Sequence, residues 1–460
     1  MTEWKPDIQR YGEPLYLALI RALHDDIERG QLPPDYRLPT QRELAEALHI
    51  AVGTVTRAYA EAERRGLIRS EGRRGTFVGG ARTSRSMLAS LVKDRPDAID
   101  LSKNHPSYEL DPDLGSALRE LSRSREVRHL LEYPPTAGLA HHRAAGARWL
   151  ESMGAPTDAG SVFITAGAQH ALSVILAAES NRGDMICTDE FTYLGVRAIA
   201  QQYDLQVTGL PVDEHGLSPA AFESACRQHR VRILYCMPTI SNPTNRVMDR
   251  DRRQEIASVA SRYDVTVIED EIMRPLVPER LGYIAEYVPD RTYLVVSTSK
   301  AIAAGLRVGF VQAPAGARQR MTESLTASCI GIPALTVELC VRWLEDGTAQ
   351  RVIDARRSDV SARHDVAARV LEGFTAHRHP SSYHCWLELP DGWTSVRLAM
   401  EAQSRGVIVA PGEVFAVDSK PPYEAVRVSV ISPTTGQLEE GLGILTGLLR
   451  GAIARQLPTV

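Results

Sequence analysis

The chain has few lysines, no long apolar run and no cysteine motif. Only five of its 53 basic residues are lysines, and the other 48 are arginines. The six cysteines show no CxxC or metal-type spacing, which indicates reduced thiols and predicts no metal site. No apolar run reaches the roughly 18 residues of a membrane helix, and the charged N-terminus lacks the apolar core of a signal peptide. We therefore expect a cytoplasmic protein with no membrane partner.

The chain also lacks a large excess of either positive or negative charge. The net charge is -4, so no global basic field points to nucleic acid, and any such partner must be met by a local patch. Hydrophobic residues make up 43% and charged residues 24%, values that exclude wholesale disorder. At roughly 100 to 200 residues per domain, a length of 460 predicts two to four domains.

The scarcity of lysine draws attention to one position. Lys300 is the sole lysine between Asn104 and Ser419. Arginine keeps its charge permanently, whereas lysine can lose a proton and act as an amine nucleophile. An isolated lysine in an arginine-biased chain is therefore a candidate for amine chemistry. Codon bias with one stray lysine is the alternative interpretation.

The first 80 residues have the pattern of three helices followed by a hairpin. Apolar residues recur every four positions at the start, as in an amphipathic helix. Thr40 and Glu43 form a capping-box pair before a second helix, and Thr54 is expected to open a third. The predicted elements are helices 14–29, 41–48 and 54–65 and strands 67–69 and 76–78. This order is that of a winged helix-turn-helix, whose third helix enters the major groove of DNA.

A local excess of arginine lies on this expected DNA face. Between Arg57 and Arg74 there are six arginines against three glutamates, a net charge of +3. A solvated helical face with a charged loop would produce the same count. The complete order of helices and wing favours DNA binding and makes Arg57 a candidate contact.

This region resembles the winged-helix domain of GntR-type transcription regulators. The resemblance rests on PLY at 14–16, LPTQRELA at 38–45, TVTRAY at 54–59 and GTFV at 75–78. It implies double-stranded operator DNA as a partner. The residues that it places against DNA are Arg42, Thr54 and Thr56, with Arg73 and Arg74 on the wing. The chain departs from the family at 51–53, where AVG replaces the usual Ser/Thr-Arg, so the operator sequence is not implied.

Strand-like and helical segments alternate from about residue 98. The strand candidates are 162–165, 185–188, 205–210, 233–236, 265–269, 293–297 and 309–312. Strands separated by helices predict an α/β fold with a mostly parallel sheet, which binds ligands beyond the carboxyl ends of its strands. We expect a DNA-binding domain at 10–79, a linker at 80–97 and a second domain at 98–460.

Polar motifs follow four of these strands. They are TAGAQ at 165–169, SNPTN at 241–245, EDE at 269–271 and STSK at 297–300 with Arg307 beyond. Asp and Asn are common turn formers, so each motif alone is a weak signal. Together they supply an anion cradle at a helix N-terminus, an amide, a carboxylate and an amine. Pyridoxal 5'-phosphate needs this set, with Lys300 for its carbonyl, Asp270 for its ring nitrogen and Arg307 with the Gly167 loop for its phosphate.

The second domain resembles the fold-type I, class I/II aminotransferase-like domains that bind pyridoxal phosphate. Such a domain has a large, mostly parallel sheet domain and a smaller C-terminal α+β domain. The resemblance makes Lys300 the catalytic Schiff-base lysine, pairs Asp270 with the ring nitrogen and Asn242 with the ring hydroxyl, and stacks Tyr193 on the ring. The residues that it assigns to the phosphate are Ser297, Ser299, Arg307, Ala168 and Gln169.

The same resemblance implies a substrate and a partner subunit. Arg427, in VRVS at 426–429, would clamp the carboxylate of an amino acid with a two-pronged bond. A surface strand arginine is the alternative interpretation of that residue. Tyr133, in YPPTAG at 133–138, would reach the phosphate of the partner subunit, which implies a homodimer.

Two departures from the aminotransferase pattern affect the expected chemistry. The tyrosine that usually follows the aspartate by two or three residues is replaced by Ile272 and Met273. Its loss should shift the pKa of the lysine-bound cofactor and weaken catalysis. The substrate-side segment, which usually bears glycine, reads SKNHP at 102–106, so ligand recognition on that side is not implied.

A GntR-type head joined to an aminotransferase-like body is the architecture of MocR-type regulators. It implies a regulator that senses an amino acid, an amine or pyridoxal phosphate itself. The alternative is a working aminotransferase with a DNA-binding appendage, which the complete set of Lys300, Asp270, Asn242 and Arg427 supports. We favour regulation, because a DNA-reading module has no purpose in metabolism alone.

Overall fold

A computed structural model describes most of the chain, as two compact units that divide after Met87. The described residues are 4–11, 14–28, 31–32, 36–64, 67–70, 75–78, 97–417 and 423–456. Arg73, Arg74 and the expected linker up to residue 96 lie outside them. Each unit is described by itself.

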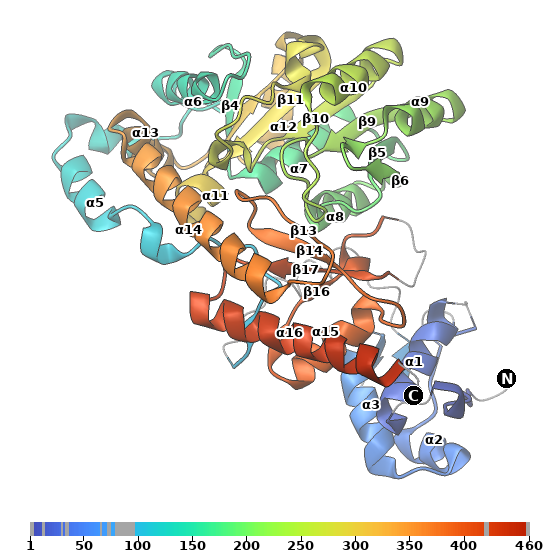
Figure 1. The fold of residues 1–460 in the computed structure, drawn as a ribbon. Helices are drawn as coiled ribbons and strands as arrows, with labels where there is room; N and C mark the ends of the chain where they lie inside the picture. Colours follow the sequence, from blue (N-terminus) through green and yellow to red (C-terminus); the bar gives the residue numbers. More distant parts are fainter. Residues whose placement is uncertain are drawn as a thin grey trace. The chain divides into compact units, whose positions relative to one another are not determined.

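The N-terminal unit contains three helices and a short hairpin (Figure 1). These elements are α1 (Leu15–Glu28), α2 (Gln41–Leu48), α3 (Val52–Arg64), β1 (Ile68–Ser70) and β2 (Thr76–Val78). The strands β1 and β2 pair antiparallel, with Arg69 opposite Phe77. Apolar side chains from all three helices and both strands form one core, which includes Leu19, Leu23, Leu44, Val55 and Val78.

Local signals explain where these helices begin. Both hydrogen bonds of the predicted capping box are present: Glu43 N–H donates to Thr40 Oγ1, and Thr40 N–H donates to Glu43 Oε2. The prediction that α3 begins at Thr54 was wrong, because it begins at Val52. The Thr54 N–H donates to Ala51 O at 2.9 Å, which places Thr54 inside the first turn.

The second unit is built on a seven-stranded sheet in the order β4-β12-β11-β10-β9-β5-β6 (Figure 1). The strands are β4 (Val162–Thr165), β5 (Met185–Asp189), β6 (Gln206–Leu210), β9 (Val231–Cys236), β10 (Thr266–Asp270), β11 (Thr292–Ser297) and β12 (Gly309–Gln312). Only β12 runs antiparallel to its neighbours. The predicted α/β class with a mostly parallel sheet is confirmed.

Helices cover both faces of this sheet. They are α6 (Ala140–Ser152), α7 (Ala168–Glu179), α8 (Leu194–Gln202), α9 (Pro219–Gln228), α10 (Arg250–Arg262), α12 (Arg318–Ser328) and α13 (Ala334–Glu345). Successive strand residues alternate between two cores: Val295 packs with α7, α8 and α12, whereas Leu294 and Val296 pack with α6 and α13. Residues of β5, β9 and β10 form a third core with α9 and α10.

A smaller α+β region completes the unit. Its four-stranded sheet has the order β13-β14-β17-β16, formed by β13 (Ala376–His377), β14 (His384–Glu388), β16 (Ala410–Pro411) and β17 (Ala425–Ser429). Other elements of the unit are α5 (Leu114–Ser122), α11 (Thr298–Ala301), α14 (Thr348–Val370), α15 (Ser395–Ser404), α16 (Thr435–Gln456), β3 (Ile99–Asp100) and β15 (Val407–Ile408). Because β3 pairs with β15, the start of this unit lies beside its C-terminal region.

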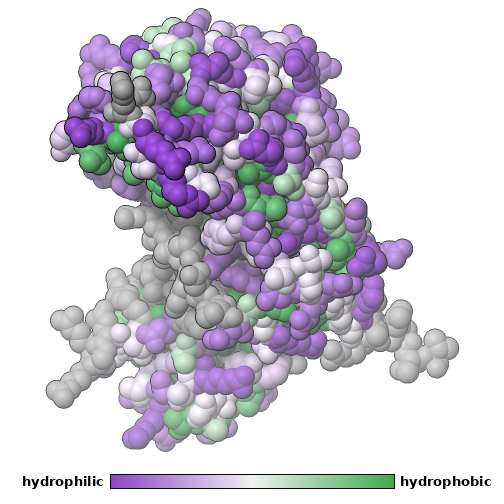
Figure 2. Space-filling view, turned by 90° about the vertical axis from the view of Figure 1, so that its left-hand side faces the viewer, coloured by the Kyte–Doolittle hydropathy of each residue, from purple (hydrophilic) through white to green (hydrophobic). Residues whose placement is uncertain are grey.

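The helices and the visible surface are both consistent with the absence of long apolar runs in the sequence. None of the helices in the described ranges is long and apolar enough to cross a membrane. The face drawn in Figure 2 is mostly hydrophilic, with small and separated hydrophobic areas.

Candidate functional site

The predicted site residues meet at one edge of the large sheet. The strands β4, β9, β10 and β11 run in the same direction, because the two antiparallel steps through β12 cancel. Their carboxyl ends therefore lie together: Gly167, Asn242 and Lys300 follow β4, β9 and β11, and Asp270 is the last residue of β10. Arg427 comes from β17 of the smaller sheet.

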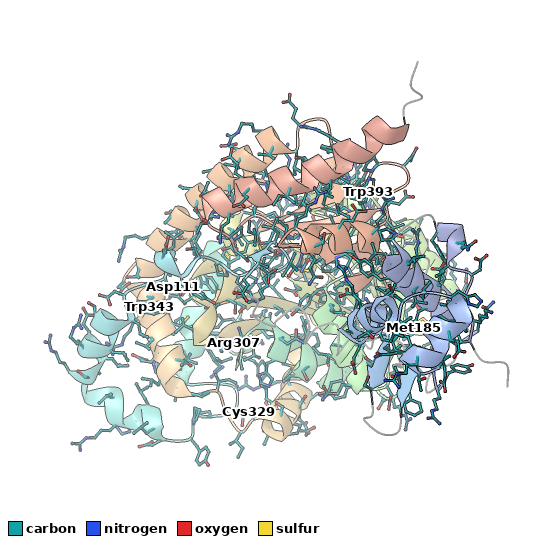
Figure 3. The ribbon with its side chains drawn as sticks, turned by 90° about the horizontal axis from the view of Figure 1, so that it is seen from below. Asp111, Met185, Arg307, Cys329, Trp343 and Trp393 are labelled. Carbon is teal, nitrogen blue, oxygen red and sulfur yellow. The ribbon has the colours of Figure 1, made fainter. Side chains whose placement is uncertain are left out.

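The expected phosphate side of the site is built around Arg307, which is labelled in Figure 3. Its Nη1 donates to Ser299 Oγ at 3.0 Å and its Nη2 to Ala166 O at 3.3 Å. Ser299 Oγ lies 3.0 Å from Ser297 Oγ. Gly167 caps α7 with φ +80, and a Cβ atom there would lie 2.8 Å from Arg307 Nη2. Only glycine leaves this cradle open, and Ala168 and Gln169 present the first backbone N–H groups of α7 to it.

Lys300 lies on α11, directly after β11. Its Nζ donates to Asn104 O at 2.5 Å, and the Tyr383 hydroxyl fixes its backbone by donating to Lys300 O at 2.6 Å. Burial, with Arg427 and Arg307 nearby, lowers the pKa of Lys300 to about 8. About a tenth of this amine is therefore uncharged at pH 7, far more than for an ordinary lysine, and a nucleophile requires the uncharged form.

Asp270 is buried at the end of β10, with 2% of its surface exposed. Its Oδ2 accepts from the Tyr235 hydroxyl at 2.9 Å and its Oδ1 from Ile272 N–H at 3.3 Å. Burial raises the pKa of Asp270 to about 7, which the bond from Tyr235 opposes. Tyr235 was missed in the sequence, although a tyrosine inside a buried strand signals a hydroxyl that needs a partner.

The position of the missing family tyrosine is filled by core packing. Met273 is 5% exposed and lies in an apolar cluster with Ile240 and Leu276. Tyr193, which was expected to stack on the cofactor ring, donates its hydroxyl to Gln169 Oε1 at 2.9 Å. Burial, followed by the charge of Asp270, raises the pKa of Tyr193 to about 12, so its phenol stays protonated.

Arg427 is buried rather than on the surface, with 5% exposed. Its Nη1 donates to Asn242 Oδ1 at 2.9 Å, its Nη2 to Ser102 O at 2.5 Å, and its guanidinium stacks 4.7 Å from the centre of the Phe415 ring. Burial lowers its pKa to about 10, so it stays charged. Its Nε is buried without a partner, which leaves donors for an anionic ligand.

Tyr133 is placed differently from these residues. It is 85% exposed, whereas the other proposed cofactor contacts lie in or beside the sheet. The neighbouring Pro134 packs against the segment before α13, because a Cβ at Gly331 would lie 2.8 Å from Pro134 Cγ. The assignment of Tyr133 to a partner subunit's phosphate stays a prediction.

The expected DNA contacts that fall within the described residues lie on α2 and α3 of the N-terminal unit. Arg42, Thr56 and Arg57 are exposed and Thr54 is half-buried. The Thr56 hydroxyl donates to Gln41 Oε1 at 2.7 Å, which fixes Gln41 beside the third helix. No DNA role was predicted for Gln41, although it lies within the LPTQRELA motif at 38–45. The Arg57 guanidinium stacks 3.9 Å from the centre of the Tyr16 ring.

Comparisons with known proteins match both units. Residues 96–445 match the family model of aminotransferase class I and II, and residues 15–78 match that of bacterial regulatory proteins of the gntR family. The chain belongs to the aminotransferase class I and II family. With its GntR domain it has the architecture of MocR-type transcriptional regulators, and its cofactor is pyridoxal 5'-phosphate.

Similar proteins include regulators and enzymes. This MocR-type chain is 29% identical to the uncharacterized HTH-type transcriptional regulator YdeF of Bacillus subtilis, over 97% of this chain and 96% of that protein. It is 27% identical to the vitamin B6 salvage pathway transcriptional repressor PtsJ of Salmonella typhimurium, over 89% and 92%. The kynurenine aminotransferase structure from Pyrococcus horikoshii shares the fold, with a TM-score of 0.73, 23% identity and coverage of 80% and 94%.

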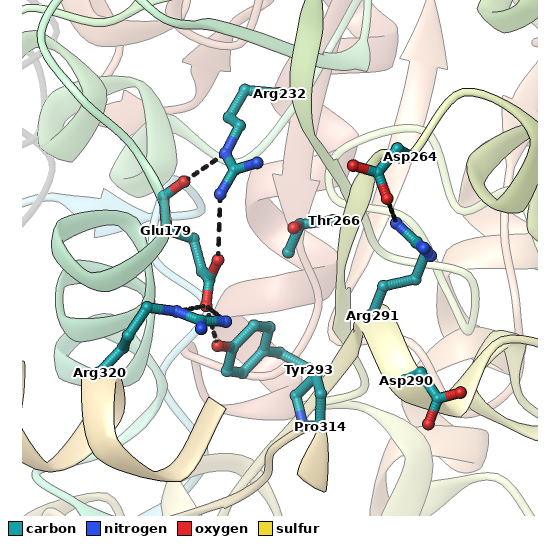
Figure 4. A pocket seen from close by; sticks show the side chains of 9 residues that line it. All are labelled: Glu179, Arg232, Asp264, Thr266, Asp290, Arg291, Tyr293, Pro314 and Arg320. Atoms are coloured by element: carbon teal, nitrogen blue, oxygen red, sulfur yellow. Dashed lines mark hydrogen bonds and ion pairs between the residues drawn. The ribbon is translucent and has the colours of Figure 1, made fainter. Parts of the chain in front are cut away.

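A polar cavity of about 230 Å³ in this MocR-type chain lies away from the residues expected to bind the cofactor (Figure 4). It is lined by Asp264, which precedes β10, whereas Asp270 ends that strand. Its buried carboxylate, Glu179, accepts from the Tyr293 hydroxyl and from Arg320 and Arg232. The carboxylate of Glu179 is already paired with these three groups. These pairs link α7, β9, β11 and α12, so we interpret the cavity as part of the packing between these elements and not as a ligand site.

Proposed function

We propose that the chain is a pyridoxal-phosphate-dependent transcription regulator that binds operator DNA as a homodimer and responds to an amino acid or amine. The observation that carries the proposal is that Lys300, Asp270 and Arg307, which fit the cofactor, meet at one edge of the large sheet in a chain that also has an exposed helix-turn-helix face. A regulator of this kind acts where the DNA is, in the cytoplasm.

The residues present fit the cofactor. Arg307, Ser297, Ser299 and the N-terminus of α7 would bind its phosphate, with Gly167 leaving the space. When bound, pyridoxal phosphate supplies an electrophilic carbonyl carbon and a ring that accepts electrons.

The other groups orient the ring and the ligand. Asp270, held by Tyr235, would keep a proton on the ring nitrogen. Asn242 accepts from Arg427 through Oδ1, which leaves its Nδ2 to donate to the ring hydroxyl. Lys300 offers a partly uncharged amine, and the remaining donors of Arg427 would bind an effector's carboxylate.

A homodimer is supported by apolar side chains that are exposed in one chain. Leu131 and Tyr133 are 87% and 85% exposed, and Ile330 is 58% exposed on the segment that packs against Pro134. Tyr108, Leu114, Leu118 and Leu335 are further exposed apolar residues of the same unit. We propose that a second copy covers this surface and receives Tyr133 at its phosphate site.

The effector would act through differential affinity. If it binds one arrangement of the two DNA-binding heads more tightly than another, it shifts the population and changes operator binding. An active aminotransferase is the second candidate, and the assembled Lys300, Asp270, Asn242 and Arg427 favour it. The absence of the family's phenol at Met273 weighs against it.

The test combines a spectrum with a gel shift. We expect visible absorption of the bound cofactor that Lys300→Ala removes, and promoter binding that Arg42→Ala weakens while the spectrum is unchanged. An unchanged spectrum in Lys300→Ala would refute the cofactor assignment. Unchanged promoter binding in Arg42→Ala would refute the proposal that the helix-turn-helix binds DNA through this face. Rapid conversion of an amino acid with 2-oxoglutarate would favour the enzyme.

A further inference from the structure

The substrate-side segment at 102–106 presents a polar atom that nothing in the site satisfies. Asn104 Oδ1 is buried and has no hydrogen-bond partner, as does Arg427 Nε. Buried polar groups without partners cost free energy and are rare, so each needs an explanation. One atom is an acceptor and the other a donor, and both belong to residues that contact the cofactor site.

The orientation of the Asn104 amide follows from its neighbours. His384 Nε2 lies 3.0 Å from Pro243 O, and a carbonyl oxygen can only accept, so Nε2 carries the hydrogen. His384 is 2% exposed, and burial keeps its pKa well below the usual range, so Nδ1 has no hydrogen. Nδ1 therefore accepts from Asn104 Nδ2 at 2.9 Å. This bond fixes Oδ1 as the free end of the amide.

The backbone of the same segment contacts both cations of the site through its carbonyl oxygens. Asn104 O accepts from Lys300 Nζ at 2.5 Å, and Ser102 O, two residues earlier, accepts from Arg427 Nη2 at 2.5 Å. The Ser432 hydroxyl donates to Lys103 O between them, which holds the segment against the end of β17. An amino acid whose carboxylate reaches Arg427 and whose amine lies near Lys300 would therefore lie against this segment, which carries the unpaired Asn104 Oδ1.

We propose that Asn104 determines effector specificity by selecting amino acids that carry a hydrogen-bond donor on their side chain. The proposal rests on the proposed function, since it concerns the effector site of that regulator. A hydroxyl, amide or ammonium group of the ligand would satisfy Oδ1. An aliphatic side chain of equal size would bury this carbonyl without a partner, which a site built for hydrogen bonding rejects.

Ligand pairs of matched shape test the selection. The full-length protein with its cofactor is titrated by calorimetry with threonine and valine, serine and alanine, and asparagine and leucine. We expect the donor-bearing member to bind at least about tenfold more tightly in one or more pairs, from the usual effect of one unpaired buried group. In Asn104→Ala the difference should fall below about threefold, because the donor-bearing ligand loses its acceptor.

Two controls separate this role from misfolding. Asn181→Ala changes an exposed asparagine in a turn before β5 and should keep the wild-type selection. His384→Gln keeps a polar group but releases the Asn104 amide, so it should reduce the selection while the visible spectrum and DNA binding persist.

The outcomes distinguish this proposal from the function on which it rests. If the protein shows the cofactor spectrum and binds DNA, but binds the members of every pair equally or binds none of the donor-bearing ligands, the role of Asn104 is refuted. Wild-type selection in Asn104→Ala also refutes it. Loss of both the cofactor spectrum and DNA binding in the wild-type protein would instead refute the proposed function.

Discussion

The Tyr235 hydroxyl donates a hydrogen bond of 2.9 Å to Asp270 Oδ2 between two central strands of the large sheet. Burial raises the pKa of Asp270 to about 7, and the bond from Tyr235 opposes this rise by stabilising the ionised carboxylate. In Tyr235→Phe the pKa should rise further, so less carboxylate remains at neutral pH to hold the protonated ring nitrogen. We expect roughly tenfold weaker binding of pyridoxal phosphate by equilibrium dialysis at pH 7.

The pH dependence identifies the cause of that loss. The defect of Tyr235→Phe should shrink as the pH rises above 7, because a growing share of Asp270 is then ionised in both proteins. A defect of equal size from pH 6 to 9 would show that Tyr235 acts only through packing. Tyr263→Phe removes a hydroxyl that bonds Arg227 far from the site and should leave cofactor affinity unchanged.

Gly167→Ala should close the phosphate cradle. The added Cβ would lie 2.8 Å from Arg307 Nη2, and the φ of +80 strains any L side chain. Gly183→Ala is the matched control, since its φ is +86 and its Cβ would meet nothing within 4 Å. Both variants should lose about 1 kcal/mol of stability in urea unfolding from backbone strain. Only Gly167→Ala should also lose cofactor affinity, and equal affinities would contradict the assigned cradle.

Lys300 makes the stability of the cofactor-free protein depend on pH. Its pKa is about 8 in the folded state against 10.5 for an ordinary lysine. Between these values the unfolded chain binds more protons, so the free energy of unfolding should rise with pH, by at most about 3 kcal/mol. Lys300→Met should lack this rise and be more stable than wild type at pH 7. Lys5→Met, on the exposed N-terminal segment, should retain the rise in urea titrations.

Thr40→Ala should weaken DNA binding without touching DNA-facing side chains. It removes the capping hydrogen bond at the start of α2, for which we expect a loss of about 1 kcal/mol. Thr394 caps α15 in the other unit by accepting from Arg397 N–H. Thr394→Ala should cost similar stability and leave the gel shift at wild-type strength. If both variants bind DNA equally well, α2 contributes no positioning of the reading head.

The sequence predicted the elements whose signals are local. All seven strands of the large sheet were expected within a few residues, because continuous apolar runs ending in turn residues mark buried parallel strands. The capping box of Thr40 and Glu43 was likewise readable. The start of α3 was missed because neither Ala51 nor Val52 has a side chain that can cap a helix. Thr54 has such a side chain, but it already lies within the first turn of the helix.

Side-chain partners that are distant in sequence could not be predicted. Asn104 meets His384 across 280 positions, and Ser102 meets Arg427 across 325. Such pairs depend on how the smaller sheet packs beside the large one, which no local pattern encodes. Lys300 was found because scarcity of lysine gave it a signal of its own, whereas Tyr235 is one tyrosine among 15.

The residues of the site lie far apart in the sequence, and this affects how long the protein survives in the cell. Its groups come from Ser102 to Arg427, and they meet only when both sheets have formed. The unfolded chain therefore has no such site, and the free cofactor stabilises the native state by mass action, by about 2.7 kcal/mol at one hundred times Kd. When the concentration of free pyridoxal phosphate falls, the fraction of unfolded protein that proteases can cleave should grow. The number of regulator molecules would then follow the cofactor level before any operator is read.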